Sequence, residues 1–323
     1  MKLEEIGFYT LEEERAKNVS EKSPMWRCEL LVTSKCNFNC PYCRGTDKSA
    51  DITLDYAKLV VDLWADDGLK NIRFSGGEPT CVEWLPELIE YAAQKSSIER
   101  IAISTNGSRS YAYYKNLWRL GVNDFSISLD ACCSADIDRM SGTTGNWDNI
   151  KENILKLSKL TYVTVGCVFD ENNVDGSLDT IRFAHNLGVS DIRIISSAQY
   201  NEALQRLDEL EPEILKVHPI LKYRVFNYSY GRNVRGIHSC DTTKCHLVKD
   251  DSAIKGDYHY PCIIYLREGG EPIGRVGKDM RKERLSWVER NNTHKNPICR
   301  ENCLDVCVDY NNTADFYFER SSQ

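Results

Sequence analysis

The sequence contains no apolar run that approaches the ~20 residues of a membrane-spanning helix, which argues against a helical membrane protein. It has no excess of basic residues either: 41 lysines and arginines stand against 48 aspartates and glutamates, a net charge of −7. This balance argues against a partner that is nucleic acid or an anionic membrane surface. The N-terminal stretch MKLEEIGFYTLEEERAK lacks the apolar segment of a secretory signal peptide, so we expect a cytoplasmic protein.

Internal repeats and low-complexity tracts are also missing, whereas cysteine is abundant. Hydrophobic residues make up 41% and charged residues 28% of the 323 residues, a composition typical of a folded chain of about two domains. There are 14 cysteines. Because a reducing cytosol disfavours a disulfide framework, metal binding or redox chemistry is the leading explanation for so many thiols.

The cysteines form an early group, a late group and a scattered remainder. The early group is Cys36, Cys40 and Cys43. The late group is Cys240, Cys245, Cys262, Cys299, Cys303 and Cys307. The remainder is Cys28, Cys81, Cys132, Cys133 and Cys167. An isolated cysteine in a folded protein is usually a small buried hydrophobic residue, and we interpret these five in that way.

From about residue 26, short β-branched runs alternate with segments of helical periodicity. We expect strands at Cys28–Thr33, Asn71–Phe74, Ile101–Ser104, Asp124–Leu129, Tyr162–Phe169 and Asp191–Ile195. We expect helices at Leu54–Asp66, Glu83–Gln94, Tyr111–Leu120, Asn149–Leu160 and Leu178–Leu187. This alternation implies parallel strands with crossover helices. The predicted fold is α/β, a partial (β/α)6 TIM-like barrel with its chemistry at the carboxyl ends of the strands.

The chain changes character after the sixth expected strand. A charged stretch over 201–215 has helical spacing, and the run over 222–228 has the composition of a strand. The segment over 257–276 predicts a β-hairpin around Gly269 and Gly270. This part of the sequence has too little apolar pattern for a core of its own, so we expect a small extension stabilised by metal.

The early cysteines directly follow the first expected strand, in the run SKCNFNCPYC. Three thiolates within eight residues can converge on one metal centre, and this loop has no fourth cysteine. A structural zinc site needs four protein ligands, whereas a site with three keeps an open position for chemistry. An iron–sulfur cluster uses the same kind of short-spaced cysteines, and a zinc site with a remote fourth ligand is the alternative.

This loop resembles the cluster loop of the radical S-adenosylmethionine (SAM) superfamily, including the aromatic residue before the last cysteine, Tyr42. Further matching elements follow in the expected order along the chain. They are Ser75-Gly76-Gly77-Glu78-Pro79, Ser104-Thr105-Asn106-Gly107, Ser126-Ile127-Ser128-Leu129-Asp130, and Arg139. The resemblance implies a [4Fe–4S] cluster on the three cysteines, whose open iron chelates SAM.

The resemblance also implies which side chains bind SAM. Gly76 and Gly77 lack a Cβ, so the backbone can approach the ligand closely. Glu78 offers a carboxylate for the methionyl ammonium, and Arg139 offers a guanidinium for the SAM carboxylate. The remaining positions expected to contact SAM are Tyr42, Ser75, Pro79, Ser104, Asn106 and Ser128. Arg139 in a surface ion pair is the alternative.

The late cysteines, with the expected hairpin, resemble the extension of radical SAM enzymes called twitch or, in its longer form, SPASM. That resemblance implies one auxiliary [4Fe–4S] cluster, with a structural zinc site as the alternative. The expected ligands come from Cys245, Cys262, Cys299, Cys303 and Cys307. Cys240 is left over, and it is a candidate hydrogen-atom donor, a spare buried thiol or a further ligand.

The expected organisation is an N-terminal extension over 1–25, a barrel core over 26–200, a connecting segment over 201–239 and the twitch-like domain over 240–323. The resemblance implies reductive cleavage of SAM and abstraction of a substrate hydrogen, with an electron donor such as flavodoxin or ferredoxin. The expected outcome is epimerisation or dehydrogenation of a carbinol carbon in a sugar- or aminoglycoside-like natural-product intermediate. The alternative is a peptide maturase that epimerises or crosslinks.

Overall fold

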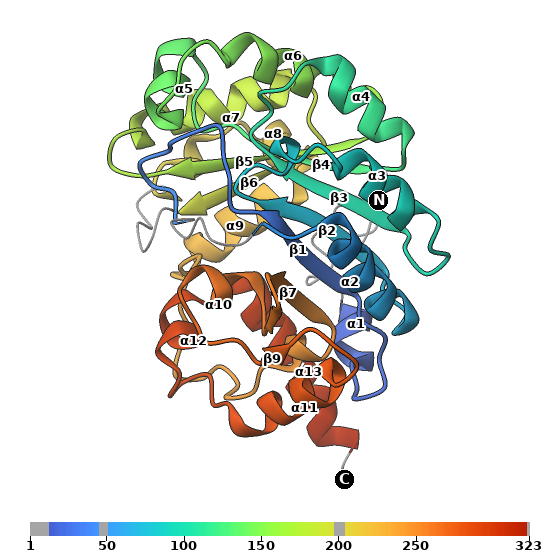
Figure 1. Cartoon of the computed structure of the whole chain (residues 1–323). Helices are drawn as coiled ribbons and strands as arrows, with labels where there is room; N and C mark the ends of the chain where they lie inside the picture. The colour runs from blue at the N-terminus through green and yellow to red at the C-terminus, as the bar shows by residue number, and fades with distance from the viewer. Residues whose placement is uncertain (1–12, 45–50, 197–203, 322–323) are drawn as a thin grey trace.

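The computed structural model describes residues 13–44, 51–196 and 204–321, and its centre is a single nine-stranded sheet (Figure 1). The strand order is β6-β5-β4-β3-β2-β1-β7-β8-β9. The strands are β1 (Arg27–Thr33), β2 (Asn71–Gly76), β3 (Arg100–Thr105), β4 (Asp124–Ser128), β5 (Tyr162–Phe169), β6 (Asp191–Ser196), β7 (Asp251–Lys255), β8 (Tyr258–Tyr260) and β9 (Gly274–Arg275). Strands β1 to β6 pair in parallel, which confirms the predicted α/β partial barrel.

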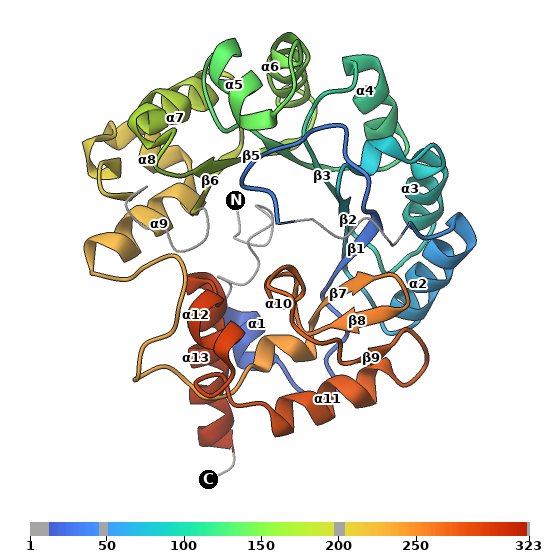
Figure 2. The same cartoon turned by 60° about the vertical axis from the view of Figure 1, so that its left-hand side comes forward.

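Helices cover one face of the parallel strands as an outer arc (Figure 2). They are α2 (Leu54–Asp66), α3 (Leu85–Ala93), α4 (Tyr111–Arg119), α5 (Ser134–Ser141), α6 (Trp147–Leu157) and α7 (Ser177–Asn186). The described part of the sheet ends at β6 on one side and at β9 on the other, so the barrel is open. Among the described helices, none combines the length and the apolar character that crossing a bilayer requires.

The two faces of the strands differ because side chains alternate along a strand. Leu30, Phe74 and Phe125 belong to one large buried cluster with the apolar sides of the surrounding helices. The alternate positions carry charged and hydroxyl side chains toward the barrel interior, and examples are Glu29 and Arg73. The hydrophobic core therefore lies between strands and helices, and the interior of the barrel is polar.

The C-terminal third continues this sheet. Strand β7 pairs in parallel with β1, and β8 and β9 add antiparallel strands beyond it. The helices of this part are α10 (Ile263–Arg267), α11 (Met280–Arg290), α12 (Pro297–Asn302) and α13 (Asp305–Ser321), with a 3-10 turn η7 at His246–Lys249. Its separate apolar cluster is small and includes Leu247, Tyr310 and Ala314. The prediction of a weak core of its own is thus consistent with the packing.

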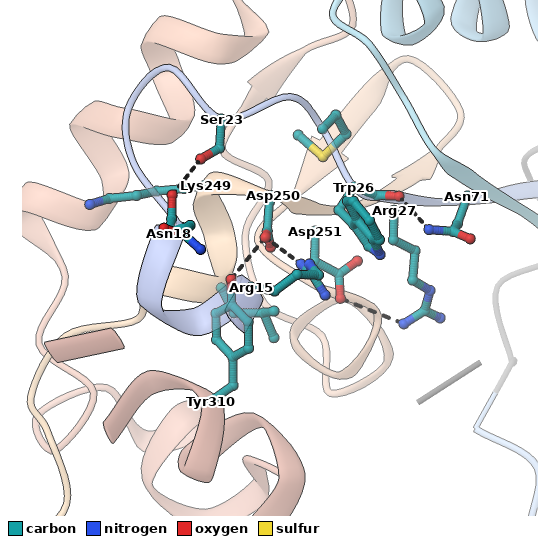
Figure 3. Close-up of polar contacts among 12 residues, drawn as sticks. Arg15, Asn18, Ser23, Trp26, Arg27, Asn71, Lys249, Asp250, Asp251 and Tyr310 are labelled. Carbon is teal, nitrogen blue, oxygen red and sulfur yellow. Dashed lines mark hydrogen bonds and ion pairs between the residues drawn. The ribbon is translucent and has the colours of Figure 1, made fainter. Parts of the chain in front are cut away.

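The N-terminal helix α1 (Glu13–Asn18) lies against α13 and joins the two ends of the chain (Figure 3). The Arg15 guanidinium pairs with the Asp250 carboxylate, which also accepts a hydrogen bond from the Tyr310 hydroxyl at 2.8 Å. The same guanidinium lies over the Trp26 ring, 4.7 Å from its centroid. Because Asp250 and Trp26 precede β7 and β1, this cluster fixes the junction of the two strands.

Two expectations after the sixth strand are wrong. The run over 222–228 lies inside helix α9 (Pro219–Ser229) instead of a strand, because the Asp191 carboxylate accepts from the Ile220 N–H at 2.9 Å and Pro219 fits the first turn. The charged stretch over 201–215 is not one helix: Leu207–Glu209 is a 3-10 turn, and α8 begins at Pro212 (Pro212–Val217), since proline disrupts a helix interior. Residues 201–203 of that stretch lie outside the described residues.

The prediction of a hairpin over 257–276 is correct for the antiparallel pairing of its two ends and wrong for the segment between them. Tyr258 pairs with Arg275 and His259 with Gly274, in antiparallel register. The expected strand after Cys262 is helix α10 instead, because the Cys262 thiol accepts from the Tyr265 N–H and caps that helix. Strand β7 was not predicted, since its short sequence DSAIK has little apolar character.

Candidate functional site

The three early cysteines lie in the loop that follows β1, at the carboxyl end of the parallel sheet. Cys36 and Cys43 are exposed and Cys40 is partly buried, while the Cys43 N–H donates to the Cys40 carbonyl at 3.0 Å. Burial raises the pKa of Cys40 to about 11, and the nearby Cys43 and Cys36 thiols add to the rise. The Cys36 and Cys43 sulfurs are therefore close enough to Cys40 to raise its pKa.

The loop after β2 holds the cysteine loop by backbone contacts. The Gly77 N–H donates to the Thr33 carbonyl at 2.8 Å, and the Glu78 N–H donates to the Lys35 carbonyl at 2.7 Å. A Cβ on Gly77 would lie 2.2 Å from the Lys35 oxygen, and one on Gly76 would lie 2.2 Å from the Thr33 oxygen. The two glycines thus permit close packing of backbone against the backbone of the cysteine loop. This packing explains why both positions lack a side chain without any contact with SAM, which was the reason predicted from the sequence.

The Glu78 carboxylate is buried behind this loop and accepts three hydrogen bonds from the protein. Its donors are the Asn106 N–H at 2.7 Å, the Thr105 hydroxyl at 2.8 Å and the Thr80 N–H at 3.0 Å. Burial raises its pKa, and these hydrogen bonds oppose the rise. Glu78 therefore ties the end of β2 to the end of β3, and its predicted contact with a methionyl ammonium stays a prediction.

The far side of the cysteine loop is held by β3 and β4. The Asn106 amide donates to the Asn37 side-chain oxygen at 2.8 Å, and the Asn37 amide donates to the Ser108 hydroxyl at 2.8 Å. The Tyr42 hydroxyl donates to the Asp130 carboxylate. Burial raises the pKa of Asp130 to about 6, even though the Tyr42 hydroxyl favours the ionised form. The loop is thus bonded to the ends of three strands besides its own.

The other expected SAM contacts divide between the barrel interior and the surface. The Ser75 hydroxyl donates to Glu29 at 2.8 Å, and the Ser104 hydroxyl accepts from Arg73 at 2.9 Å. Pro79 begins a short 3-10 turn. Ser128 is exposed at the end of β4. Arg139 is about half exposed on α5 and pairs with Asp136 at 2.9 Å, the alternative expected from the sequence.

Inward-facing charges were missed by sequence reasoning. The Arg73 guanidinium pairs with the Asp124 carboxylate at 3.2 Å, and Arg193 on β6 donates to the Thr164 hydroxyl at 3.0 Å. The Arg193 Nε is buried without a hydrogen-bond partner in the described part of the chain. The signal was present in the sequence as single arginines at alternate positions of otherwise apolar strands. The interior can therefore bind polar or anionic groups.

Five late cysteines form a second group of thiols, and they are Cys245, Cys262, Cys299, Cys303 and Cys307. All five are partly buried. Burial raises the pKa of Cys245 to about 11 and that of Cys262 to about 12, and the Cys245 thiol adds to the rise at Cys262. Burial also raises the pKa of Cys303, with contributions from the four other thiols. Each of the four other sulfurs is therefore near enough to Cys303 to raise its pKa.

Hydrogen-bond donors point at two of these thiols. The Cys262 thiol accepts from the Tyr265 N–H at 3.4 Å, and the Cys245 thiol accepts from the Asn311 amide at 3.6 Å. Such donors favour the thiolate, which is the form that binds metal. No described set of three or more histidine, cysteine, aspartate or glutamate side chains is gathered closely enough to hold a single metal ion.

Cys240 does not belong to this group by position. It is exposed in the loop before η7, next to Asp241 and Thr242. The Asp241 carboxylate accepts from the Asn312 amide at 2.8 Å, and the Thr242 hydroxyl donates to Asp315 at 2.7 Å, so this loop lies along α13. The predicted role of Cys240 as a hydrogen donor stays a prediction.

A family model described as "Radical SAM superfamily" matches residues 30–195, which include the cysteine loop, strands β2 to β5 and most of β1 and β6. The chain belongs to the radical SAM superfamily. It is an enzyme of a family that binds SAM and a [4Fe–4S] cluster, and three thiols in one exposed loop suit that cluster. This confirms the resemblance drawn from the motifs.

Curated relatives match only part of their own length. A GTP 3′,8-cyclase of Tolumonas auensis is 36% identical over 107 residues, which are 32% of each chain. A GTP 3′,8-cyclase of Clostridium perfringens is 32% identical over 198 residues, 58% of this chain and 60% of that protein. The chain therefore spans between about a third and three fifths of these relatives.

Solved structures share the fold at low identity. Streptococcus suis SuiB has a TM-score of 0.60 at 13% identity, covering 83% of this chain and 66% of that chain. A second structure, anSMEcpe with bound AdoMet and the Cp18Cys peptide, has a TM-score of 0.57 at 15% identity, covering 91% of this chain and 97% of that chain. The likeness thus extends beyond the barrel into the C-terminal third.

Proposed function

We propose that this enzyme cleaves SAM reductively and directs the resulting 5′-deoxyadenosyl radical at a substrate C–H bond inside the barrel. The observation that carries the proposal is the loop with Cys36, Cys40 and Cys43, three thiols and no fourth, at the carboxyl end of β1. A [4Fe–4S] cluster on these thiols supplies the electron for the cleavage. The cysteine loop, held by the ends of β2, β3 and β4, keeps the three ligands in place.

The protein's own groups would bind and orient SAM. The candidate contacts with SAM are the residues predicted from the motifs. Position next to the cysteine loop supports some of these residues more strongly than others. The Glu78 and Asn106 backbone is fixed directly behind that loop. Arg139 is supported least, because it is half exposed and paired with Asp136.

We further propose that the late thiols hold an auxiliary [4Fe–4S] cluster in a twitch-like domain. The support is a group of five partly buried thiols in or next to η7, α10, α12 and α13. The four others raise the pKa of Cys303, and two of the five accept hydrogen bonds. Four of the five are sufficient for one cluster. Such a cluster would accept or relay an electron during dehydrogenation.

The charged side chains of the barrel interior indicate which kind of substrate would bind there. Arg193 has a buried Nε without a hydrogen-bond partner in the described part of the chain, and the Asp124 carboxylate, which favours its charged form, already pairs with Arg73 at 3.2 Å. A buried guanidinium that shares its nearby carboxylate with a second arginine is costly, so an anionic group of the substrate would help to compensate its charge. This favours a sugar-like substrate that carries a carboxylate or phosphate over the cationic, aminoglycoside-like substrate that was the other expectation from the sequence. The proposed outcome is epimerisation or dehydrogenation at a carbinol carbon.

A peptide maturase is the second candidate. It is supported by the fold shared with SuiB, which was also solved bound to its precursor peptide SuiA with a TM-score of 0.58. The anSMEcpe structure likewise contains a peptide. Under this alternative the open barrel would admit a peptide side chain, and the reaction would be epimerisation or crosslinking.

The test uses anaerobically reconstituted holoenzyme with SAM and a reductant such as flavodoxin or ferredoxin. Formation of 5′-deoxyadenosine supports the proposed cleavage, and its absence contradicts it. With candidate substrates in deuterated water, deuterium in the product supports hydrogen return from an exchangeable thiol such as Cys240. An oxidised product without deuterium supports electron loss to the auxiliary cluster.

A further inference from the structure

A fully buried arginine lies at the centre of the C-terminal third. Arg284 on α11 has an exposed fraction of 0%. Its guanidinium donates to the carbonyls of Val248, Tyr260 and Pro261 at 3.0, 2.9 and 3.0 Å, and to the Asp251 carbonyl. Two further contacts are with the Ser252 hydroxyl and the His259 ring, at 3.3 and 3.4 Å. The five N–H groups of one side chain are therefore shared among six acceptors.

These acceptors belong to the segments that carry two of the late cysteines. Val248 lies in η7, which begins directly after Cys245, and Pro261 immediately precedes Cys262. The Cys262 thiol caps α10, and Cys245 is the residue from which η7 starts. By bonding to Val248 and Pro261 together, Arg284 fixes the distance between the two thiol-bearing segments.

The charge of Arg284 has no hydrogen-bonded counter-ion among the described residues, because all six acceptors are neutral groups. Burial lowers its pKa to about 10, and the nearby Asp251 and Cys262 groups oppose that fall. The Pro261 carbonyl that Arg284 binds belongs to the residue immediately before Cys262, so the buried charge lies next to a thiol-bearing segment. A buried cation beside thiols is stabilised when those thiols are ionised.

We propose that Arg284 is the internal counter-ion and positioning residue of the auxiliary cluster. This inference rests on the auxiliary cluster proposed above. Arg284 holds the segments of Cys245 and Cys262 in the geometry that the cluster needs. Its positive charge stabilises the more negative, reduced state, so it raises the reduction potential of the cluster.

The test uses full-length protein in which Cys36, Cys40 and Cys43 are all replaced by alanine, so that only the auxiliary cluster remains. Arg284→Met removes the charge, and Arg284→Lys keeps the charge but loses the planar fork. Arg290→Met, an exposed arginine on the same helix, is the matched control. The readouts are iron per chain, the rate of iron release to a chelator, and the midpoint potential from EPR-monitored titration.

We expect Arg284→Met to shift the potential to a more negative value and to speed iron release. Arg284→Lys is expected to stay near the parent potential while releasing iron faster, and Arg290→Met is expected to change neither. If Arg284→Met binds no cluster, a parent-like potential in Arg284→Lys still supports the counter-ion role. Unchanged potentials in Arg284→Met, or equal shifts in both Arg284 variants, would overturn it. A parent protein without iron refutes the auxiliary cluster itself, and that failure is visible before any Arg284 variant is compared.

Discussion

The Tyr42 hydroxyl, inside the three-cysteine loop, donates a hydrogen bond to the buried Asp130 carboxylate at the end of β4. The other oxygen of Asp130 accepts from the Val168 N–H on β5 at 2.8 Å. One carboxylate thus links the loop to two neighbouring strands. The aromatic residue before the last cysteine therefore has a structural partner in this chain, besides any contact with SAM.

Replacing Tyr42 by phenylalanine tests this link. Tyr42→Phe keeps the ring and leaves one buried Asp130 oxygen without its donor, which costs about 1–3 kcal/mol. We expect faster iron release from the early cluster to a chelator. Tyr113→Phe is the control, because the Tyr113 hydroxyl has no side-chain hydrogen bond within the described residues. Equal release rates in Tyr42→Phe and the parent protein would show that the link does not hold the loop.

Gly77 is the position where a single methyl group should disturb the site most. Its added Cβ would lie 2.2 Å from the Lys35 carbonyl oxygen, and backbone cannot yield as a side chain can. We expect Gly77→Ala to lower the free energy of unfolding by about 1–3 kcal/mol and to reduce iron in the early cluster. Gly277→Ala is the control, since a Cβ added at Gly277 would meet no atom within 4 Å. Wild-type iron content in Gly77→Ala would contradict the packing role.

The order of strands and helices was predictable because both periodicities are strong in the barrel half. In the run CELLVT of β1, for example, every residue except the partly buried Leu31 is buried, as expected. Secondary structure that depends on contacts with residues far away in the sequence was harder to predict. Helix α9 has the composition of a strand, yet the Asp191 carboxylate and Pro219 set its start, and only the folded chain brings Asp191 there. Strand β7 forms because β1 offers a free edge.

The cysteines and the Gly-Gly-Glu element were predictable as a site because their chemistry is written in short motifs. Their supporting contacts were not, since Asn37, Asp130 and Arg284 reach partners far away in sequence. Gly77 was predicted to allow the backbone to approach SAM, whereas in the structure it packs against the Lys35 carbonyl. Sequence motifs therefore predict a candidate reactive centre, whereas the residues that position its loop can be identified only from the fold.

Asp191 makes stability depend on pH. Burial raises the pKa of Asp191 to about 6, against an ordinary value near 3.8, even though it accepts hydrogen bonds from the start of α9. Because the folded state favours the neutral carboxyl, Asp191 contributes to the free energy of unfolding at low pH. That contribution is lost as the pH rises from about 4 to about 6. The loss amounts to about 3 kcal/mol.

Asp191→Asn removes this titration and keeps the size of the side chain. Chemical unfolding of metal-free protein at several pH values should therefore show a flatter profile between about pH 4 and about pH 6 in the variant. Asp130, with a pKa raised to about 6, leaves a residual slope in the same direction. A variant profile as steep as that of the parent protein would contradict the assignment to Asp191.

Cys303 and Cys240 make a matched pair for the auxiliary cluster. All four other thiols of the group raise the pKa of the Cys303 thiol, whereas Cys240 is exposed in a neighbouring loop. Two four-iron clusters correspond to about eight irons per chain, so we expect Cys303→Ala to lose up to about half of the iron. Cys240→Ala should retain it. Full iron in Cys303→Ala would remove Cys303 from the ligand set, and loss in Cys240→Ala would add Cys240 to it.

The most direct measurement compares 5′-deoxyadenosine formation in the parent protein and in the variant with Cys36, Cys40 and Cys43 all replaced by alanine. Both proteins are reconstituted anaerobically, reduced and supplied with SAM, and their iron is quantified. We expect 5′-deoxyadenosine from the parent, none from the variant, and about half the iron in the variant. Equal 5′-deoxyadenosine from both proteins, or none from an iron-replete parent, would contradict this expectation.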